Sequence, residues 1–564
     1  METSIKNKIH IHFSPRFEWL QFSKKIFFRS AAFASQQLQQ EKEVFDHLTD
    51  AKSEDEWIAA IKKINSFFAV VQHQSEQCYA AVDRVRSIPL FYGVENDNFY
   101  LSDVAKWVQE KVGDKKRDPL AETEFLLTGY VTGSDTLYPQ VKQLQAGECL
   151  FVISSAMGLQ LSKRIYFQYH HKYSDMVNES EWLEQLDKVL YNIFQRLTNL
   201  AQGRTLVIPL SGGFDSRLIV LMLKRIGYDN IITYSYGKPG NKESKISQEI
   251  AQKLNLRWEF VPYSNDAWYN WFHSNERKTH YQISDTLSSS FHLQDWPAVW
   301  ELKQKCLIPE NSIFIPGHTG DLLSGKQSKS VFIARHSDDL LSEKQSKGDP
   351  NLYRSEQKHI LSEDLITAII QRHYCLRRWG NRENSYADAI HKKILASLGE
   401  LDYFPDIASA FESWNVKERQ AKFIINSVRV YEFWEYDWWL PLWDSDFICF
   451  WSNVPTQYRI NQKLYKVYVQ ELYSKMVGTN QRFIIGRKID EINDIFKIFV
   501  KKTSLYQLAR LINNMREYDK NSHSYYGVMP RQKFYAYYLG KERFENFNSF
   551  LSSEYLGKID FKIE

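Results

Sequence analysis

An apolar segment that breaks into a glycine turn constrains the fold of this chain more than any other feature. Residues 206–216 read LVIPLSGGFDS. The apolar start is typical of a buried strand, and a helix-like run follows the turn. Gly212 and Gly213 let backbone N–H groups approach a ligand closely, and a helix N-terminus adds its positive dipole end. The segment therefore predicts a binding site for phosphate groups, with the Ser211 and Ser216 hydroxyls as further donors.

The elements around this turn predict a parallel sheet. Gly227 ends an apolar helix over residues 217–226, and residues 231–237 read as a second strand. From Glu243, apolar residues recur every four positions as in a helix, and the aromatic run 258–263 reads as a third strand. This β-α-β-α-β order is the start of a doubly wound α/β sheet, whose ligands bind at the carboxyl ends of the strands. The glycine turn lies at that edge.

The composition is that of a globular protein. The 564 residues are 43% hydrophobic and 25% charged, with a net charge of +4, which gives no reason to expect nucleic acid as a partner. No run approaches the ~18 apolar residues of a membrane span, and the polar start lacks the apolar core of a signal peptide. We therefore expect a cytoplasmic protein that does not bind membranes.

The five cysteines are scattered along the sequence, and their spacing is not that of metal ligands. They are expected to be reduced and mostly packed thiols. Tryptophans gather at positions 434, 438, 439 and 443, and we expect this group to belong to the core rather than to a substrate cage.

The glycine turn with Asp215 and Ser216 resembles the PP-loop ATP pyrophosphatases, and the rest of the chain resembles their asparagine synthetase-like branch. No GxxxxGK[ST] motif is present, so a Walker-type ATPase is the weaker interpretation. The resemblance implies a PP-loop sheet of the adenine nucleotide α-hydrolase type, with ATP as substrate and Mg²⁺ as cofactor. The adenine is expected against the backbone near Leu210 and Ser235. The nucleotide-binding residues that the resemblance implies are Leu210, Ser211, Gly212, Gly213, Asp215, Ser216, Ser235, Gly237 and Gly317.

The front third resembles the glutaminase domain of asparagine synthetases. Alternating strand-like runs begin at Ile64, where INSFFA occupies the place of the family's "NG-F-A" strand. DRVRSIPLFY, residues 83–92, occupies that of its "DR-G-x-x-PL-Y" turn, and FYLSD at 99–103 and the stretch ending at Val152 resemble its last strands. The resemblance implies an N-terminal Ntn-type α+β sandwich.

The nucleophile of that domain is missing from its place. Glutamine hydrolysis in the family needs a cysteine that becomes the first residue, because its own α-amino group activates the thiol. Position 2 here is Glu2, and the nearest cysteine is Cys78. We therefore expect no glutaminase activity and a front domain that serves as a scaffold or an interface, with a homodimer as one expected assembly. Nitrogen would come from free ammonia, from a separate glutaminase, or from an amine of the acceptor.

A second loop carries the expected metal site. IFIPGHTGDLLSG, residues 313–325, is expected to be strand-like and resembles the family's "SG-E-G-A-D-E-L-F-G" loop. By this resemblance Asp321 joins Asp215 in holding Mg²⁺. His318 and Leu322 stand where the family has acidic residues, so aspartate is not the expected substrate. His318 is a candidate for a role at the reaction centre, and the alternative is a hydrogen-bonded loop histidine.

The catalytic lysine is expected late in the chain. A tryptophan-rich stretch resembles the family's "E-x-R-x-PFLD" segment, with Asp437 and Pro441 in place and Trp439 where the family has arginine. Beyond it, KVYVQEL begins at Lys466 and resembles "K-Y-I-L-R-E-A", whose lysine neutralises charge at the reacting phosphorus. The predicted catalytic residues are Lys466, with Lys463 as the alternative, together with His318 and Asp437. A solvated helix lysine is the other interpretation of Lys466.

Three domains are predicted: residues 1–170, glutaminase-like; 171–480, the asparagine synthetase-like ATP pyrophosphatase; and 481–564, a helical extension. Residues 336–363 are predicted to be a mobile insertion. The expected function is an ATP-dependent ligase that adenylates a carboxylate of a small molecule or peptide and forms an amide with ammonia or an amine. Alternatives are a scaffold that has lost catalysis, a macrolactam- or β-lactam-type cyclase, and a tRNA-modifying enzyme.

Overall fold

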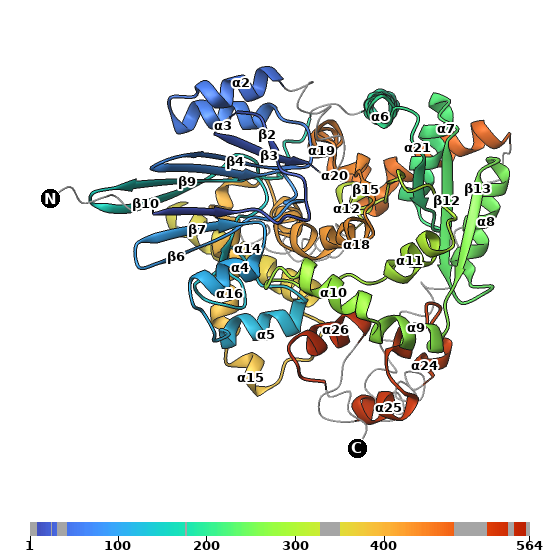
Figure 1. The fold of residues 1–564 in the computed structure, drawn as a ribbon. Helices are drawn as coiled ribbons and strands as arrows, with labels where there is room; N and C mark the ends of the chain where they lie inside the picture. Colours follow the sequence, from blue (N-terminus) through green and yellow to red (C-terminus); the bar gives the residue numbers. More distant parts are fainter. Residues whose placement is uncertain are drawn as a thin grey trace.

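Two stacked β-sheets form the N-terminal part of the molecule, called the front part below, and a parallel sheet organises the remainder (Figure 1). The computed structural model describes residues 8–23, 25–30, 42–174, 178–326, 350–478, 516–539 and 546–559. Glu2, residues 336–349 of the predicted insertion and residues 481–515 of the predicted extension lie outside the described residues.

The front strands lie in the orders β1-β7-β6-β8 and β10-β9-β5-β4-β3-β2. They are β1 (Ile9–His12), β2 (Leu20–Gln21), β3 (Ile26–Ser30), β4 (Phe68–Gln74), β5 (Gln77–Val82), β6 (Phe91–Glu95), β7 (Asn98–Ser102), β8 (Lys142–Gln143), β9 (Glu148–Ser155) and β10 (Gly158–Ile165). The helices of this part are α2 (Lys42–Asp50), α3 (Glu54–Lys63), α4 (Ala105–Lys111) and α5 (Pro119–Thr128). The strands predicted from Ile64 onward are confirmed.

The two front sheets pack face to face because successive strand residues point to opposite faces. In β4, Phe68 and Val70 pack with α2 and α3, whereas Ala69 and Val71 pack against the other sheet. A run of apolar residues like this one must be covered on both sides. The result is an α-β-β-α sandwich, with α4 on the outer face of the four-stranded sheet.

The second part of the chain is built on a five-stranded sheet in the order β13-β12-β11-β14-β15, in which every pair is parallel. The strands are β11 (Leu206–Pro209), β12 (Ile231–Gly237), β13 (Arg257–Pro262), β14 (Ile313–Phe314) and β15 (Asp437–Trp438). The predicted parallel sheet is therefore confirmed. The chain leaves β11 toward β12 on one side and later adds β14 on the other, so the carboxyl end of β11 is a topological switch point, where such sheets bind ligands.

Helices cover both faces of this sheet and extend beyond it (Figure 1). The longer ones are α6 (Glu179–Ala201), α7 (Phe214–Ile226), α8 (Lys242–Lys253), α9 (Asn265–His273), α10 (Asn275–Ser284), α11 (Trp296–Gln304), α14 (Pro350–His373), α16 (Ala387–Leu398), α17 (Ile407–Asn415), α18 (Val428–Phe433), α19 (Ser445–Asn453), α21 (Lys463–Val477), α25 (Arg531–Leu539) and α26 (Phe547–Tyr555). Short helices are α12 (Gly320–Leu323), α15 (Asn381–Asn384), α20 (Thr456–Arg459) and α24 (Glu517–Lys520). Tight helical turns are η2 (Leu401–Tyr403), η4 (Ile425–Ser427), η5 (Pro441–Trp443), η6 (Ile460–Gln462) and η7 (Tyr525–Val528), and η3 (Val416–Ile424) is a π-helix.

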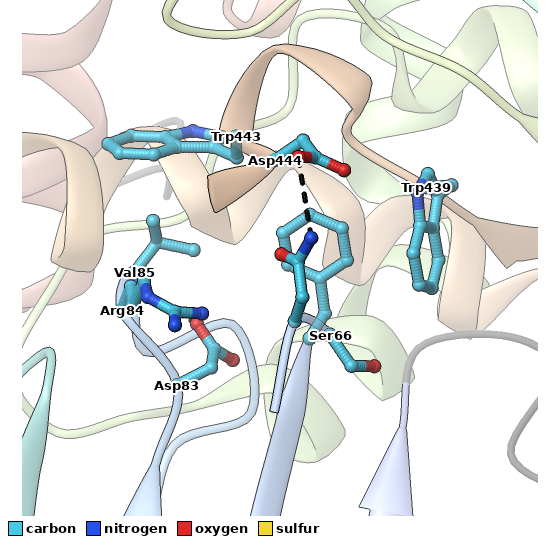
Figure 2. Close-up of a pocket in the computed structure, with 9 residues that line it drawn as sticks. Ser66, Asp83, Arg84, Val85, Trp439, Trp443 and Asp444 are labelled. Carbon is cyan, nitrogen blue, oxygen red and sulfur yellow. Dashed lines mark hydrogen bonds between the residues drawn. The ribbon is translucent and has the colours of Figure 1, made fainter. Parts of the chain in front are cut away.

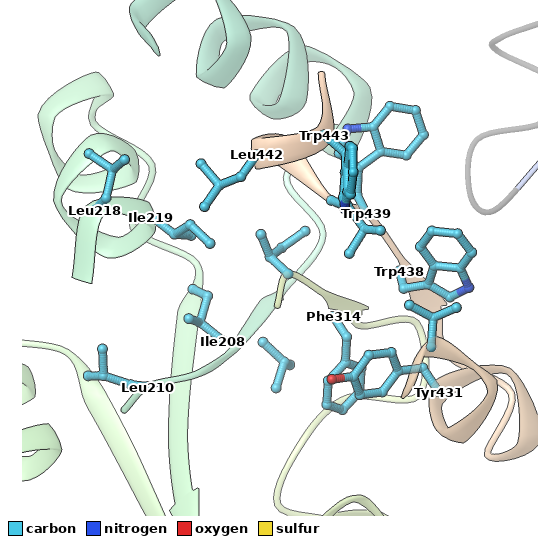
Figure 3. Close-up of a cluster of buried hydrophobic side chains, with 14 of the residues drawn as sticks. Ile208, Leu210, Leu218, Ile219, Phe314, Tyr431, Trp438, Trp439, Leu442 and Trp443 are labelled. Atoms are coloured by element: carbon cyan, nitrogen blue, oxygen red, sulfur yellow. The ribbon is translucent and has the colours of Figure 1, made fainter. Parts of the chain in front are cut away.

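The core beneath the glycine turn draws side chains from distant segments. Figure 3 shows Ile208 and Leu210 together with Leu218 of α7, Phe314 of β14 and the tryptophans near β15. The predicted core tryptophans are confirmed, because each is at most 8% exposed: Trp434, Trp438, Trp439 and Trp443. This apolar support fixes the position of the turn above it.

Two local predictions were wrong. The strand expected over residues 313–325 is only two residues long, since Pro316 and Gly317 turn the chain toward α7. Most thiols are not packed, because three cysteines are exposed and two are buried. The exposed ones are Cys306, Cys375 and Cys449. Helix α14 covers residues 350–363 of the predicted insertion, and the mobility of the insertion stays a prediction.

Among the helices that the structure describes, none combines the length and apolar character needed to cross a membrane.

The sandwich and the parallel-sheet part meet along a packed seam. Figure 2 shows Trp443 over the loop that carries Arg84 and Val85, and Trp439 on the side of Ser66. The Asn65 amide donates a hydrogen bond to Asp444 (3.4 Å). Asn65 Oδ1 also accepts from the Ser445 hydroxyl at 2.6 Å. The cavity between these side chains is only about 10 Å³, room for a single water molecule. The seam therefore holds no organic ligand at this point.

A buried ion pair on the π-helix strengthens the seam. Glu418 and Lys422 are paired, and both side chains are fully buried. Lys422 Nζ also donates to the Val131 carbonyl (2.8 Å) and the Gly133 carbonyl (2.6 Å) of the front part, while the Gly133 N–H donates to Glu418. A buried charge is tolerated only with such full pairing.

Candidate active site

The glycine loop after β11 is ordered by its own hydroxyls. The Ser211 N–H donates to Ser216 Oγ at 3.0 Å, and the Gly213 N–H donates to Ser211 Oγ at 3.1 Å. Gly213 is the N-cap of α7 and brings no side chain to cover the helix end. Since Gly213 is exposed and Gly212 half-buried, the first turn of a 13-residue helix opens toward solvent, as an anion site requires.

The second predicted loop packs directly on this helix start. A Cβ atom on Gly317 would lie 2.9 Å from both the Asp215 Cβ and the Ser216 backbone nitrogen. A Cβ on Gly320 would lie 2.7 Å from Asp215 Oδ1. At Gly317 a side chain would collide with the backbone at the start of α7, whereas at Gly320 it would displace the Asp215 carboxylate and the Leu442 side chain. The contact brings Asp321 beside Asp215.

Two carboxylates meet at this edge of the sheet. Asp215 Oδ2 accepts from the Asp321 N–H at 3.2 Å, and Asp321 forms an ion pair with Lys326 at 2.9 Å. Burial and the negative charge of Asp321 raise the pKa of Asp215 to about 7. A bound cation would relieve this repulsion, and carboxylate oxygens are the ligands that Mg²⁺ prefers.

The protein's own donors do not complete a metal site. The described residues contain no group of three or more His, Cys, Asp or Glu side chains placed to hold a metal ion. Mg²⁺ sites often use one or two carboxylates plus substrate phosphates and water. Asp215 and Asp321 fit that arrangement, with a phosphate-bearing substrate on the adjacent loop.

His318 belongs to the same loop as Asp321, and its ring contacts the Ser427 hydroxyl. Its Nε2 is 3.1 Å from the Ser427 hydroxyl, whereas Nδ1 is buried without a hydrogen-bond partner among the described residues. Burial, with a smaller contribution from His292, lowers the pKa of His318 to about 3. Leu322, in the place of a family glutamate, is fully buried. The loop therefore presents a neutral imidazole where the family has carboxylates.

The structure places the two candidate lysines at the start of α21. Lys463 pairs with Glu179 on the surface, and Lys466 Nζ donates to the Asn461 carbonyl at 2.6 Å. The α21 residue that reaches the glycine loop is Tyr465, whose hydroxyl donates to Asp215 Oδ1 at 2.8 Å. No family motif pointed to Tyr465. The sequence shows only that Tyr465 lies on the apolar face of that helix, together with Val469 and Leu472.

The remaining predicted residues divide between the two edges of the sheet. Ser235 and Gly237 end β12 beside Leu210, whose N–H donates to the Tyr234 carbonyl at 2.9 Å. Asp437 instead begins β15, where its register partner is Ile313 at the start of β14. There it pairs with Arg204 at 2.6 Å. The structure therefore places Asp437 at the amino edge, away from the glycine loop.

Replacing Tyr465 with phenylalanine is expected to lower the Mg²⁺ affinity of the nucleotide-bound protein about tenfold. The variant loses one hydrogen bond that favours the ionised form of Asp215, and a hydrogen bond to a charged group contributes about 1.5–3 kcal/mol. Titration of the protein–ATP complex with Mg²⁺ measures the effect. Tyr403→Phe, on an exposed tyrosine, is the matched control; equal affinities would show that Tyr465 only packs.

The sequence comparisons concern the segment just described. Residues 196–275 match the family model of asparagine synthase. The matched segment is asparagine synthase-like and contains β11, the glycine loop, α7, β12, α8 and β13. No curated protein sequence matches the chain.

Two solved structures also show limited likeness. One is described as the allosteric regulatory enzyme of purine biosynthesis, at 9% identity, with 43% of this chain and 61% of that chain covered and a TM-score of 0.18. The other is glutamine phosphoribosylpyrophosphate amidotransferase from B. subtilis, at 12% identity, with 44% of this chain and 73% of that chain covered and the same TM-score of 0.18. This chain thus spans less than two thirds of the first structure's length. Scores this low support no conclusion about the fold.

Proposed function

We propose that this protein is an ATP-dependent ligase of the asparagine synthase type, which adenylates a carboxylate and converts it to an amide. One observation carries the proposal. An open helix N-terminus at the switch point of a parallel sheet lies against two acidic residues, Asp215 and Asp321, inside the segment that matches asparagine synthase. Phosphate binding by loop amides and Mg²⁺ binding by adjoining carboxylates are the two requirements of such chemistry.

In the proposed reaction, the loop from Ser211 to Ser216 binds the phosphates of ATP, and the adenine lies against the backbone near Leu210 and Ser235. A substrate carboxylate oxygen attacks the α-phosphorus, the bond to the β-phosphate oxygen breaks, and pyrophosphate leaves. Mg²⁺, when held by Asp215 and Asp321, would neutralise charge on the leaving group. Loop amides stabilise that charge at no cost in reorganisation.

In the second step, the nitrogen lone pair of ammonia or an amine attacks the acyl carbon, AMP departs with the bonding electrons, and a proton is lost from nitrogen. Lys466 is proposed to stabilise negative charge in these steps, which requires its amine to leave the Asn461 carbonyl. The PP-loop character of the sheet is part of the same proposal.

The front sandwich is proposed to be Ntn-type and to lack glutaminase chemistry. Cys78 and Cys149, the cysteines of the first 170 residues, are fully buried in β5 and β9. Burial raises the pKa of Cys78 to about 12, and burial also raises the pKa of Cys149. Since the thiolate is the nucleophile, neither thiol is suited to attack glutamine. Ammonia, a separate glutaminase or an amine of the acceptor would then supply nitrogen.

The test is pyrophosphate release, measured with ATP and Mg²⁺ over a panel of carboxylic acids and peptides, with ammonium or glutamine as the nitrogen source. At least one carboxylate is expected to stimulate release with ammonium, with AMP and an amide formed in equal amounts, and glutamine is expected not to replace ammonium. Tight ATP binding without pyrophosphate release across the panel would instead support the scaffold. ADP formation would exclude adenylation.

A further inference from the structure

A second cavity lies beside the proposed ATP site. It measures about 300 Å³ and is formed by the loop after α10 and by two segments near the C-terminus. The residues that line it are His292, Leu293, Gln294, Asn521, His523, Tyr525, Tyr526, Asn546, Phe547 and Asn548. None of these described lining residues is Asp, Glu, Lys or Arg. A volume of this size accommodates a small organic group.

The C-terminal wall of the cavity rests on the carboxyl end of β12. The Lys238 N–H donates to the Ser522 carbonyl at 2.7 Å, and a Cβ on Gly237 would lie 2.8 Å from that same oxygen. The ring of His523 is 5.8 Å from that of Tyr236. The cavity therefore adjoins the edge of the sheet where the glycine loop lies.

The opposite wall connects to the second loop of the site. The His292 ring lies 5.6 Å from Phe423 of the π-helix, and Gln420 of that helix accepts a hydrogen bond from Thr319, next to His318, at 2.8 Å. A ligand in the cavity would thus lie between the end of β12 and the neighbourhood of His318.

The wall has unused hydrogen-bonding capacity. His292 Nδ1 and Tyr525 Oη are buried atoms without a hydrogen-bond partner among the described residues. Buried polar groups in native proteins almost always have a partner, so these two lining residues leave hydrogen-bonding capacity beside the cavity that a small rotation of either ring would offer to a ligand. Burial lowers the pKa of His292 to about 4 and also lowers the pKa of His523, so both rings are neutral near pH 7.

We propose that this cavity binds an uncharged, hydrogen-bonding planar group of the organic substrate, an aromatic ring or a carboxamide, rather than a carboxylate or an ammonium group. The identification of that ligand as a substrate rests on the proposed ligase function. Side-chain amides supply donors and acceptors, aromatic rings supply flat apolar contact, and a charged group would find no opposite charge among the described lining residues. The C-terminal segment then selects the substrate.

Equilibrium binding tests this assignment independently of turnover. N-acetyl-tyrosinamide, N-acetylaspartate and adenosine are titrated separately into the full-length protein, with and without ATP. The tyrosinamide is expected to bind with a dissociation constant of millimolar or below, both with and without ATP. N-acetylaspartate is expected to bind at least tenfold more weakly. The Asp215→Ala variant is expected to bind the tyrosinamide as tightly as the wild type. Binding to the cavity is thus measured independently of the ligase reaction, and a failed ligase assay would not contradict it.

Two variants locate the probe. Tyr525→Phe removes the unpartnered hydroxyl, and Asn546→Asp replaces the side-chain NH₂ while keeping the oxygen that caps α26 through the Ser549 N–H. Each is expected to weaken tyrosinamide binding about five- to tenfold, and Tyr403→Phe should not change it. Absence of saturable tyrosinamide binding, equal binding of N-acetylaspartate, or unchanged affinity in both cavity variants would overturn the proposal. Adenosine binding that ATP and the tyrosinamide both displace would assign the cavity to the purine base instead.

Discussion

Asp215→Ala is expected to reduce ATP-dependent pyrophosphate release by about 100- to 1,000-fold, with the substrate that gives the highest rate in the screen. The carboxylate is central to the site, because it accepts from the Asp321 N–H and from the Tyr465 hydroxyl. Its loss removes one of the two proposed Mg²⁺ ligands, and the loss of one preorganised group that stabilises transition-state charge typically has an effect of this size. Initial rates at saturating ATP measure it.

The control for that variant is Asp229→Asn, which removes a carboxylate just beyond the other end of the same helix. Asp229 is largely exposed and pairs with Lys224, so wild-type activity is expected. Asp321→Asn should resemble Asp215→Ala, and raised Mg²⁺ concentration should partly restore its rate. If Asp215→Ala keeps the wild-type rate, the assignment of Mg²⁺ to this pair of carboxylates is wrong.

Glu412→Gln is expected to lower the free energy of unfolding by about 3–5 kcal/mol, because it leaves a buried guanidinium without its counter-charge. Glu412 is fully buried, His171 Nε2 lies 3.0 Å from its carboxylate, and Arg459 forms an ion pair with it. Arg459 also donates to the Leu323 carbonyl at 2.8 Å, which ties this network to the second loop of the site. Urea unfolding followed by tryptophan fluorescence measures the loss.

The same carboxylate sets a pH dependence. Burial opposes its ionisation, but Arg459 and His171 lower the pKa of Glu412 from 4.5 to about 2. A lowered acidic pKa stabilises the fold fully above the unfolded value, so this contribution is expected above about pH 4.5 and is lost as the pH falls toward about 2. Glu412→Gln should show a smaller loss over this range. Glu400→Gln, on an exposed residue, should behave as the wild type; equal pH profiles for all three proteins would contradict the network's role.

The parts that could be predicted from the sequence are those in which neighbouring residues decide the outcome. The run from 206 to 216 specifies a strand, a turn and a helix start within a few residues, and the structure has them in that order. The spacing to the next strand specifies the parallel crossover to β12. Tryptophans 434 to 443 were predictable as core because their size and number leave little alternative to burial.

The parts that escaped prediction depend on contacts between distant segments. Tyr465 reaches Asp215 only because of how α21 is rotated against α7, which no local pattern records. Asp437 matches a family motif, but a motif does not say at which edge of the sheet its strand begins. His171 lies at the predicted boundary between the first two domains and belongs to no motif, yet it is buried with Glu412 and Arg459. His523 and Tyr525 belong to no motif at all.

The π-helix that carries Glu418 and Lys422 has a mechanical consequence. Gln420 of the same turn accepts a hydrogen bond from Thr319, next to His318, at 2.8 Å. The segment is therefore hydrogen-bonded to the front part through Gly133 and to the second loop of the candidate site through Thr319. A hinge motion between the two halves would have to break the buried hydrogen bonds that join Lys422 and Glu418 to Val131 and Gly133. A domain-scale opening between the two halves is therefore disfavoured, since a buried charge left without its partners is costly.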